Sequence, residues 1–163
     1  MFGGYENEEK FGEGLETEEI VDELRVELNG IESNDGLDFD GKLAAFQEIL
    51  HHDRSDDEAI KVKEDSFSLI VTLYCDNGKF DDILSVIESN STFFESVPKA
   101  KTAKMVRNAL QIVSKMPDSL DLQQSLCHNI IDWCEKEKRN FLKHRVESKL
   151  CGVLFLKVKS DRF

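Results

Sequence analysis

Two cysteines, a histidine and six lysines or arginines lie within the nineteen residues WCEKEKRNFLKHRVESKLC, positions 133–151. Cysteine and histidine are preferred zinc ligands, so Cys127, Cys134 and His144 are the sharpest candidate for a metal site. Cys127 and Cys134 are seven positions apart, which separates them by about 10 Å along a helix that rises 1.5 Å per residue. That separation is too long for tetrahedral zinc, and the chain has no Cys-x-x-Cys pair. We therefore expect no metal site and no cofactor.

Basic residues gather in two clusters, although the net charge of the chain is −12. Such clusters suit nucleic acid or an acidic protein surface. The acidic balance of the whole chain, and the lack of aromatic residues within the first cluster, favour a protein partner; a plain solvated face stays open as the alternative. The candidate partner-binding residues are Lys99, Lys101, Lys104 and Arg107, and then Lys136, Lys138, Arg139, Lys143 and Arg145. We expect charge reversal at Lys101 and Lys104 to weaken such a contact more at low salt than at high salt.

Charge is divided unevenly along the chain. Residues 1–58 carry nineteen Asp or Glu against four Lys or Arg, whereas residues 59–163 carry fourteen against seventeen. The early segment NEEKFGEGLETEE has too few apolar side chains to offset the entropy lost on ordering it. We predict an acidic, largely flexible arm over residues 1–37, which can hold a short helix from Thr17 to Leu28, stopped by Asn29-Gly30. A helical-repeat domain is predicted for residues 38–163.

The sequence lacks the patterns typical of catalysis, secretion and membrane insertion. Its four histidines belong to no nucleophile motif, and neither a phosphate loop nor a Gly-rich nucleotide fingerprint is present. It has no signal peptide and no eighteen-residue apolar run, and its four cysteines are scattered. We predict a non-enzymatic protein of the cytoplasm and nucleus. Nucleic acid, membrane and small-molecule substrates are not expected among its partners.

Apolar residues recur at three- and four-residue spacing from about residue 43 onward, which predicts an all-α fold. The segment 56–78 begins with acidic residues and ends at Asn77-Gly78, both typical helix boundaries. Helices are also expected from about residues 80, 98, 119 and 140, each of them stopped by a polar turn. The stretch from Lys136 to Asn140 is predicted to be the bend between the last two helices, where Glu135 can pair with Arg139 if the turn stays helical.

Polar turns that precede an apolar residue recur about every forty residues and end at Phe80, Leu120 and Phe163. This period predicts a right-handed α-solenoid of antiparallel, TPR-like helix pairs, although the tetratricopeptide consensus itself is not matched. Because the last turn falls at residue 163, we expect the domain to be truncated in mid-repeat. Apolar surface would then stay uncovered near Leu154 and Phe155, with a risk of self-association.

Three segments resemble one known family. They are DDEAIKVKEDSFSLIVTLYCDNGKFDDIL, VPKAKTAKMVRNALQIVSKM and IIDWCEKEKRNFLKHRVESKL. Over about residues 40–163 their order and spacing are similar to the N-terminal helical repeats of the 26S proteasome non-ATPase regulatory subunit 11 family, whose members end in a PCI domain. The acidic start of the chain does not resemble the family, and we expect the PCI winged-helix module to be absent.

The resemblance implies a non-catalytic scaffold or interaction subunit of the proteasome regulatory particle lid. It implies contacts with other lid subunits, the ATPase ring and the core α-ring in ubiquitin-dependent protein degradation. Three alternatives stay open. One is a helical-repeat adaptor of another PCI-type complex, similar to the COP9 signalosome. Another is a truncated paralogue that is not incorporated into proteasomes. The third is a small metal or redox protein, which rests on the cysteines.

Overall fold

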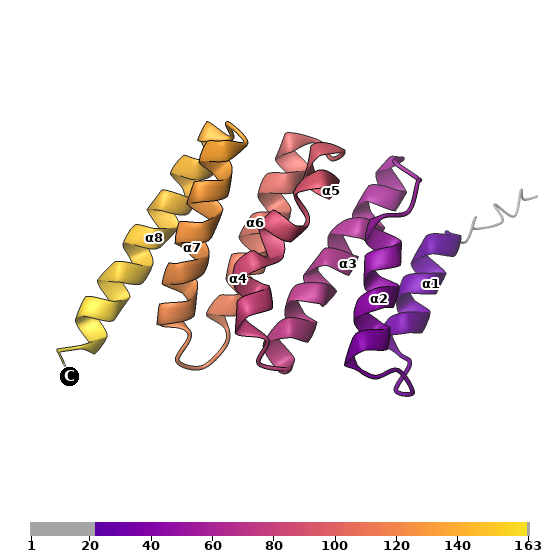
Figure 1. Ribbon diagram of the computed structural model, residues 1–163, viewed down its shortest axis with the longest axis horizontal. Coiled ribbons are helices and arrows are strands. Elements are labelled where there is room, and N and C mark those ends of the chain that lie inside the picture. The colour runs from indigo at the N-terminus through magenta and orange to yellow at the C-terminus, as the bar shows by residue number, and fades with distance from the viewer. Residues whose placement is uncertain (1–21, 163) are drawn as a thin grey trace, which may run out of the picture.

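The computed structural model describes residues 22–162, which fold into helices joined by short turns (Figure 1). The helices are α1 (Glu23–Glu32), α2 (Phe39–Leu50), α3 (Asp57–Asp76), α4 (Phe80–Ser89), α5 (Ser91–Glu95), α6 (Lys99–Ser114), α7 (Leu120–Lys136) and α8 (Asn140–Ser160). No strand occurs within residues 22–162. The prediction of an all-α fold is confirmed.

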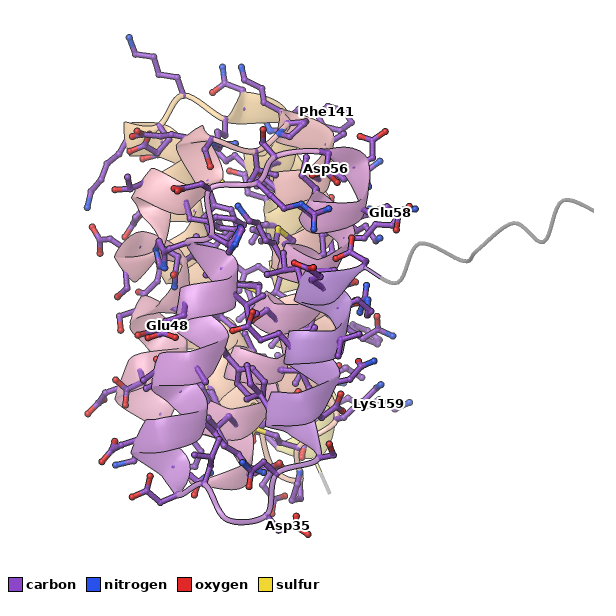
Figure 2. The ribbon with its side chains drawn as sticks, turned by 90° about the vertical axis from the view of Figure 1, so that its right-hand side faces the viewer. Asp35, Glu48, Asp56, Glu58, Phe141 and Lys159 are labelled. Atoms are coloured by element: carbon purple, nitrogen blue, oxygen red, sulfur yellow. The ribbon has the colours of Figure 1, made fainter. Side chains whose placement is uncertain are left out.

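The helices stack side by side in two layers, as an α-solenoid does (Figure 1). Helix α3 packs against α2, α4 and α6, while α7 packs against α4, α6 and α8. Figure 2 looks along the stack from its α1 end, with Glu48 of α2 on one side and Glu58 of α3 and Phe141 of α8 on the other. One layer therefore contains α1, α3, α6 and α8, and the other contains α2, α4 and α7.

Local sequence signals set most of the helix boundaries. Asp22, Asp38 and Asp56 cap α1, α2 and α3, each accepting a hydrogen bond from a backbone N–H of the first turn at 2.8–3.2 Å. Helix α3 ends at the predicted Asn77-Gly78 stop, where Gly78 has a φ of 62°. Lys138 takes the same role after α7 with a φ of 55°. The predicted bend between α7 and α8 is confirmed.

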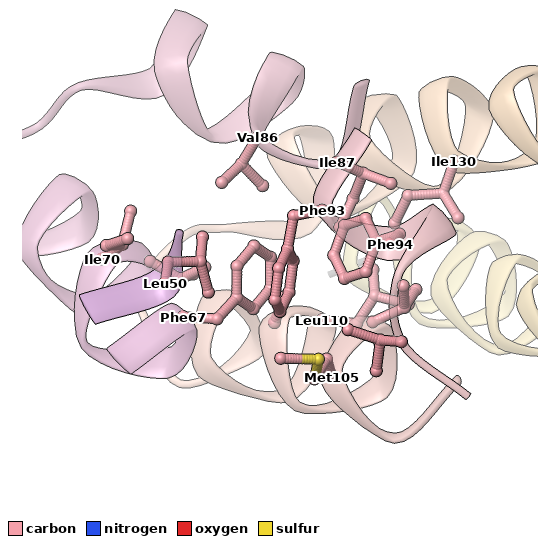
Figure 3. Close-up of a cluster of buried hydrophobic side chains, with 14 of the residues drawn as sticks. Leu50, Phe67, Ile70, Val86, Ile87, Phe93, Phe94, Met105, Leu110 and Ile130 are labelled. Atoms are coloured by element: carbon pink, nitrogen blue, oxygen red, sulfur yellow. The ribbon is translucent and has the colours of Figure 1, made fainter. Parts of the chain in front are cut away.

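An aromatic cluster joins the two layers in the middle of the stack (Figure 3). Phe94 of α5 is fully buried, and its ring meets those of Phe67 in α3 at 5.3 Å and Trp133 in α7 at 5.7 Å between centroids. The Trp133 indole also donates a hydrogen bond of 3.0 Å to the Ser91 hydroxyl. The five-residue helix α5 therefore connects α3 with α7, through ring contacts to both and a hydrogen bond from α7.

Helix α1 does not end where the sequence predicted. The structure extends it through Gly30 to Glu32, and its first residue is Glu23. Leu24 and Leu28 are buried in the common core, because α1 packs against α2 and α3. This packing outweighs the preference of an Asn-Gly pair to stop a helix, which is about 1 kcal/mol for glycine. Thr17 lies outside the described residues, and the division of the chain at residue 37 stays a prediction.

Two further features concern α4 and α5. Phe80, the apolar residue predicted to follow a polar turn, begins α4 and is 50% exposed. Helix α5 was not predicted, since five residues are too short to show a helical period.

The end of α8 exposes apolar side chains. Leu154, Phe155, Leu156 and Val158 are 40%, 68%, 51% and 55% exposed, respectively. The predicted uncovered apolar surface is therefore confirmed. Self-association through this surface stays a prediction.

Candidate functional site

Helices α6 and α8 run parallel, and a groove lies between them. It consists of two adjoining hollows, of about 440 and 460 Å³. The first lies between the start of α6 and the turn that leads into α8, from Lys99 to Phe141. The second follows the next turns of both helices, from Arg107 to Lys149. Together they extend along the whole of α6, from Lys99 to Ser114, about 22 Å at 1.5 Å per residue. We call this surface the α6–α8 groove.

The walls of the α6–α8 groove are cationic. Six basic side chains line it: Lys99, Arg107, Lys138, Arg139, Arg145 and Lys149. No aspartate or glutamate is among the lining residues, and within residues 22–162 none of these six forms an ion pair. An otherwise acidic chain therefore concentrates uncompensated positive charge on one surface, where it attracts anionic groups.

The floor and one end of the groove are apolar. Leu110, Leu142 and Val146 line it from below. At the end nearest the α7–α8 turn stands Phe141, which is 71% exposed and has the Arg145 guanidinium 4.9 Å from its ring centroid. Phe141 is labelled near the top of the molecule in Figure 2, whose view is along the stack. The groove thus offers both charge and apolar contact, a combination that suits a peptide rather than a small ion.

Arg139 is the most firmly held cation of the groove. Its guanidinium donates a hydrogen bond of 3.2 Å to the backbone carbonyl of Phe94 and lies 4.9 Å from the Trp133 ring centroid. The sequence predicted a pair with Glu135 if the turn between α7 and α8 stayed helical. Residue 138 instead adopts a positive φ and breaks the helix, and Glu135 accepts from Lys143 at 2.6 Å.

Two residues of the first predicted cluster serve the fold. Lys104 donates a hydrogen bond of 2.6 Å to one carboxylate oxygen of Glu64 in α3, and Lys101 lies 3.0 Å from the other oxygen. The Glu64 side chain is only 5% exposed. Burial alone would raise the pKa of Glu64, but the two lysines outweigh it and hold that pKa below its usual range. Charge reversal at these lysines would therefore damage the fold, and it does not test a binding surface.

Lys136 and Lys143 also have internal partners. Lys136 pairs with Glu88 at 2.8 Å, and Lys143 pairs with Glu135. Five of the nine predicted residues therefore line the groove, and the other four are ion-paired. Lys149 was not predicted; it lies one helical turn after Arg145 and shares its face of α8. Whether the nine bind a partner stays a prediction.

The cysteines and histidines of the opening segment are separated in the structure. Cys127 and Cys134 are fully buried on α7, whereas His144 is exposed on α8 and lies 3.1 Å from the carboxylate of Glu147. In the described part of the chain, no three potential metal ligands come together. The neighbouring pair His51-His52 is likewise exposed at the end of α2. No described helix is long and apolar enough to span a membrane.

Burial predicts an order of reactivity for the four thiols. It raises the pKa of Cys127 and of Cys134 to about 11, and it raises the pKa of the half-buried Cys75 as well. Cys151 is exposed. With iodoacetamide at neutral pH we expect Cys151 to be alkylated first and the two α7 cysteines last, because the thiolate is the reacting form. Peptide mass spectrometry at several times measures this order, and early labelling of Cys127 in the folded chain would contradict it.

A family model supplies the relationship of this chain to known proteins. The model described as the 26S proteasome regulatory subunit RPN6 N-terminal domain matches residues 35–157. That span contains α2 to α7, most of α8 and every residue that lines the α6–α8 groove. The chain belongs to this family. The resemblance noted in the sequence is therefore confirmed, and the RPN6 N-terminal domain fold includes the candidate site.

Individual relatives agree with the RPN6 assignment. The 26S proteasome non-ATPase regulatory subunit 11 homolog of Arabidopsis thaliana is 36% identical over 112 residues, which are 69% of this chain and 27% of the relative. The subunit 11 of Dictyostelium discoideum is 32% identical over 68% of this chain and 26% of its own length. The probable 26S proteasome regulatory subunit rpn6 of Schizosaccharomyces pombe is 28% identical over 81% of this chain and 31% of its own length. The matched part thus spans between 26% and 31% of these relatives.

Proposed function

We propose that this chain is a non-catalytic interaction subunit of the 26S proteasome regulatory particle. The observation that carries the proposal is the RPN6 family match, which extends over residues 35–157 and covers the whole groove. The matched relatives are named as proteasome regulatory subunits, two of them as non-ATPase subunits. These names favour the proteasome over a signalosome-like complex. As a proteasome subunit, the chain acts in ubiquitin-dependent protein degradation, in the cytoplasm and nucleus.

The finer part of the proposal concerns the partners. The chain contacts other lid subunits, the ATPase ring and the core α-ring, and the α6–α8 groove is the surface that makes the contact with an acidic neighbour. The six cations, none of which is ion-paired within residues 22–162, support this choice, because charged partners attract over several ångströms and orient the encounter. The ion-paired lysines 101, 104, 136 and 143 are not part of the contact.

Affinity purification of the tagged chain at low salt, followed by quantitative mass spectrometry, tests the function and the groove together. A groove variant combines Arg107→Gln, Arg145→Gln and Lys149→Gln, all at exposed positions without ion-pair partners in the described chain. We expect it to recover about fivefold less ATPase-ring and core α-subunits than the wild type, because each exposed charge pair contributes up to about 1 kcal/mol.

A matched control carries Lys115→Gln, directly after α6, and Lys159→Gln, on α8, both outside the α6–α8 groove. It loses almost as much charge, so we expect it to recover proteasome subunits like the wild type. Equal recovery by the groove variant and the control would remove the groove from the proposal. The absence of proteasome subunits from every sample would overturn the function itself.

A further inference from the structure

The α6–α8 groove has a complementary segment in its own sequence. Residues 1–21 contain seven glutamates and one lysine, a net charge of −6. The groove presents six cations with no acidic residue among its lining. A segment with a net charge of −6 and a surface with six cations attract one another strongly when they belong to one chain, because the effective concentration of the segment near the groove is then high.

The position of α1 brings this segment within reach. Helix α1, which residues 1–21 precede, belongs to the same layer as α3, α6 and α8 (Figures 1 and 2). Packed helices lie 8–10 Å apart, so the start of α1 and the groove are separated by about 30 Å across α3 and α6. A stretch of 21 residues can span up to about 70 Å at 3.3 Å per residue. Residues 1–21, the first part of the predicted acidic arm, can therefore lie along the groove without any change in the helical stack.

Apolar side chains add a second complementarity. Phe2, Tyr5 and Phe11 are the aromatic residues of the segment. The groove offers the exposed Phe141 ring at one end and a floor of leucine and valine. An aromatic side chain that packs beside Phe141 covers apolar area that would otherwise face water, and aromatic pairs add further stabilisation.

We propose that residues 1–21 bind in the α6–α8 groove of the same chain, with their glutamates against the six cations and an aromatic residue beside Phe141. The bound arm occupies the surface that an acidic partner would use, so a partner must displace it. This competition rests on the proposed function, whereas the intramolecular contact does not. It gives the chain a built-in competitor that lowers the affinity of weak acidic partners.

Zero-length carbodiimide cross-linking of the purified full chain tests the contact directly. The reagent joins a carboxylate to an amine that touches it, and the groove contains three reporter amines, on Lys99, Lys138 and Lys149. Mixing isotope-labelled with unlabelled chain distinguishes links within one chain from links between two. We expect links from glutamates of residues 1–21 to these lysines, within one chain, present at low salt and lost at high salt.

Two variants complete the test. Arg107→Gln with Arg145→Gln keeps all three reporter lysines but removes two of six charges, so we expect about fivefold fewer arm-to-groove links. The control Lys115→Gln with Lys159→Gln should leave them unchanged, and circular dichroism checks that both variants are folded. Three outcomes would overturn the proposal. Residues 1–21 could be linked only to lysines outside the groove, the links could join two different chains, or the links could persist in the arginine variant. The experiment needs no proteasome, so its failure differs from a failure of the proposed function.

Discussion

Replacing Phe94 with alanine is expected to lower the free energy of unfolding by about 4 kcal/mol, as large buried aromatic truncations do. Phe94 is fully buried and contacts the rings of Phe67, Phe93 and Trp133 (Figure 3). Its loss would leave a cavity where α3, α5 and α7 meet, and the surrounding rings cannot all move to fill it. Urea unfolding followed by helical circular dichroism measures the change.

Phe141 provides a matched control. It is the same residue type as Phe94, and each of the two lies close to an arginine, Phe94 to Arg139 and Phe141 to Arg145. It is 71% exposed and belongs to the groove rather than to the core. We expect Phe141→Ala to change the unfolding free energy by less than about 0.5 kcal/mol, as surface substitutions usually do. Similar unfolding midpoints for the two variants would contradict the assignment of Phe94 to the centre of the core.

Helices with a long apolar period could be predicted from the sequence. Helix α3 has acids at its start, a periodic inner face and an Asn-Gly stop, so local signals and tertiary packing agree. The end of α1 could not be predicted, because two leucines packed against distant helices decide it. Helix α5 could not be predicted for a different reason: it has only five residues, and its role depends on Phe94, whose ring meets those of Phe67 and Trp133 far along the chain.

The candidate site was predictable in composition but not in arrangement. Both basic clusters are evident in the sequence, and the turn that carries Lys138 and Arg139 was expected. The contact of α6 with α3 was not, and it pairs Lys101 and Lys104 with Glu64, which lies 37 and 40 residues earlier in the chain. The remaining cations come together only because α6 and α8 are neighbours in one layer. Charge patterning identified the right region, and tertiary structure determined which charges are free.

The ion-paired cluster leads to the second large expected effect. Replacing Lys101 and Lys104 with methionine should destabilise the chain by about 2 kcal/mol at neutral pH, because it leaves the buried Glu64 carboxylate without a partner. The value is below that of a fully buried pair, since the lysines are 38% and 51% exposed and water screens them. Lys136→Met, which breaks the exposed pair with Glu88, should leave the free energy of unfolding nearly unchanged, because water screens that pair.

The pH dependence identifies Glu64 as the cause. In the wild type the pKa of Glu64 lies below its ordinary value of 4.5, so its contribution to stability is present above that pH and is lost as pH falls through the folded-state pKa. Without the lysines, burial raises the folded-state pKa above 4.5, and stability is then lost as pH rises. The difference in unfolding free energy between the wild type and the double variant should therefore be widest near neutral pH and narrow toward pH 4.5.

Adding Glu64→Met to the double variant removes the unpaired charge and should restore stability at neutral pH, since hydrophobic replacement of a buried ion pair is often neutral. A gap that stays constant with pH, or a triple variant no more stable than the double, would mean that lost lysine packing destabilises the variant rather than an isolated carboxylate.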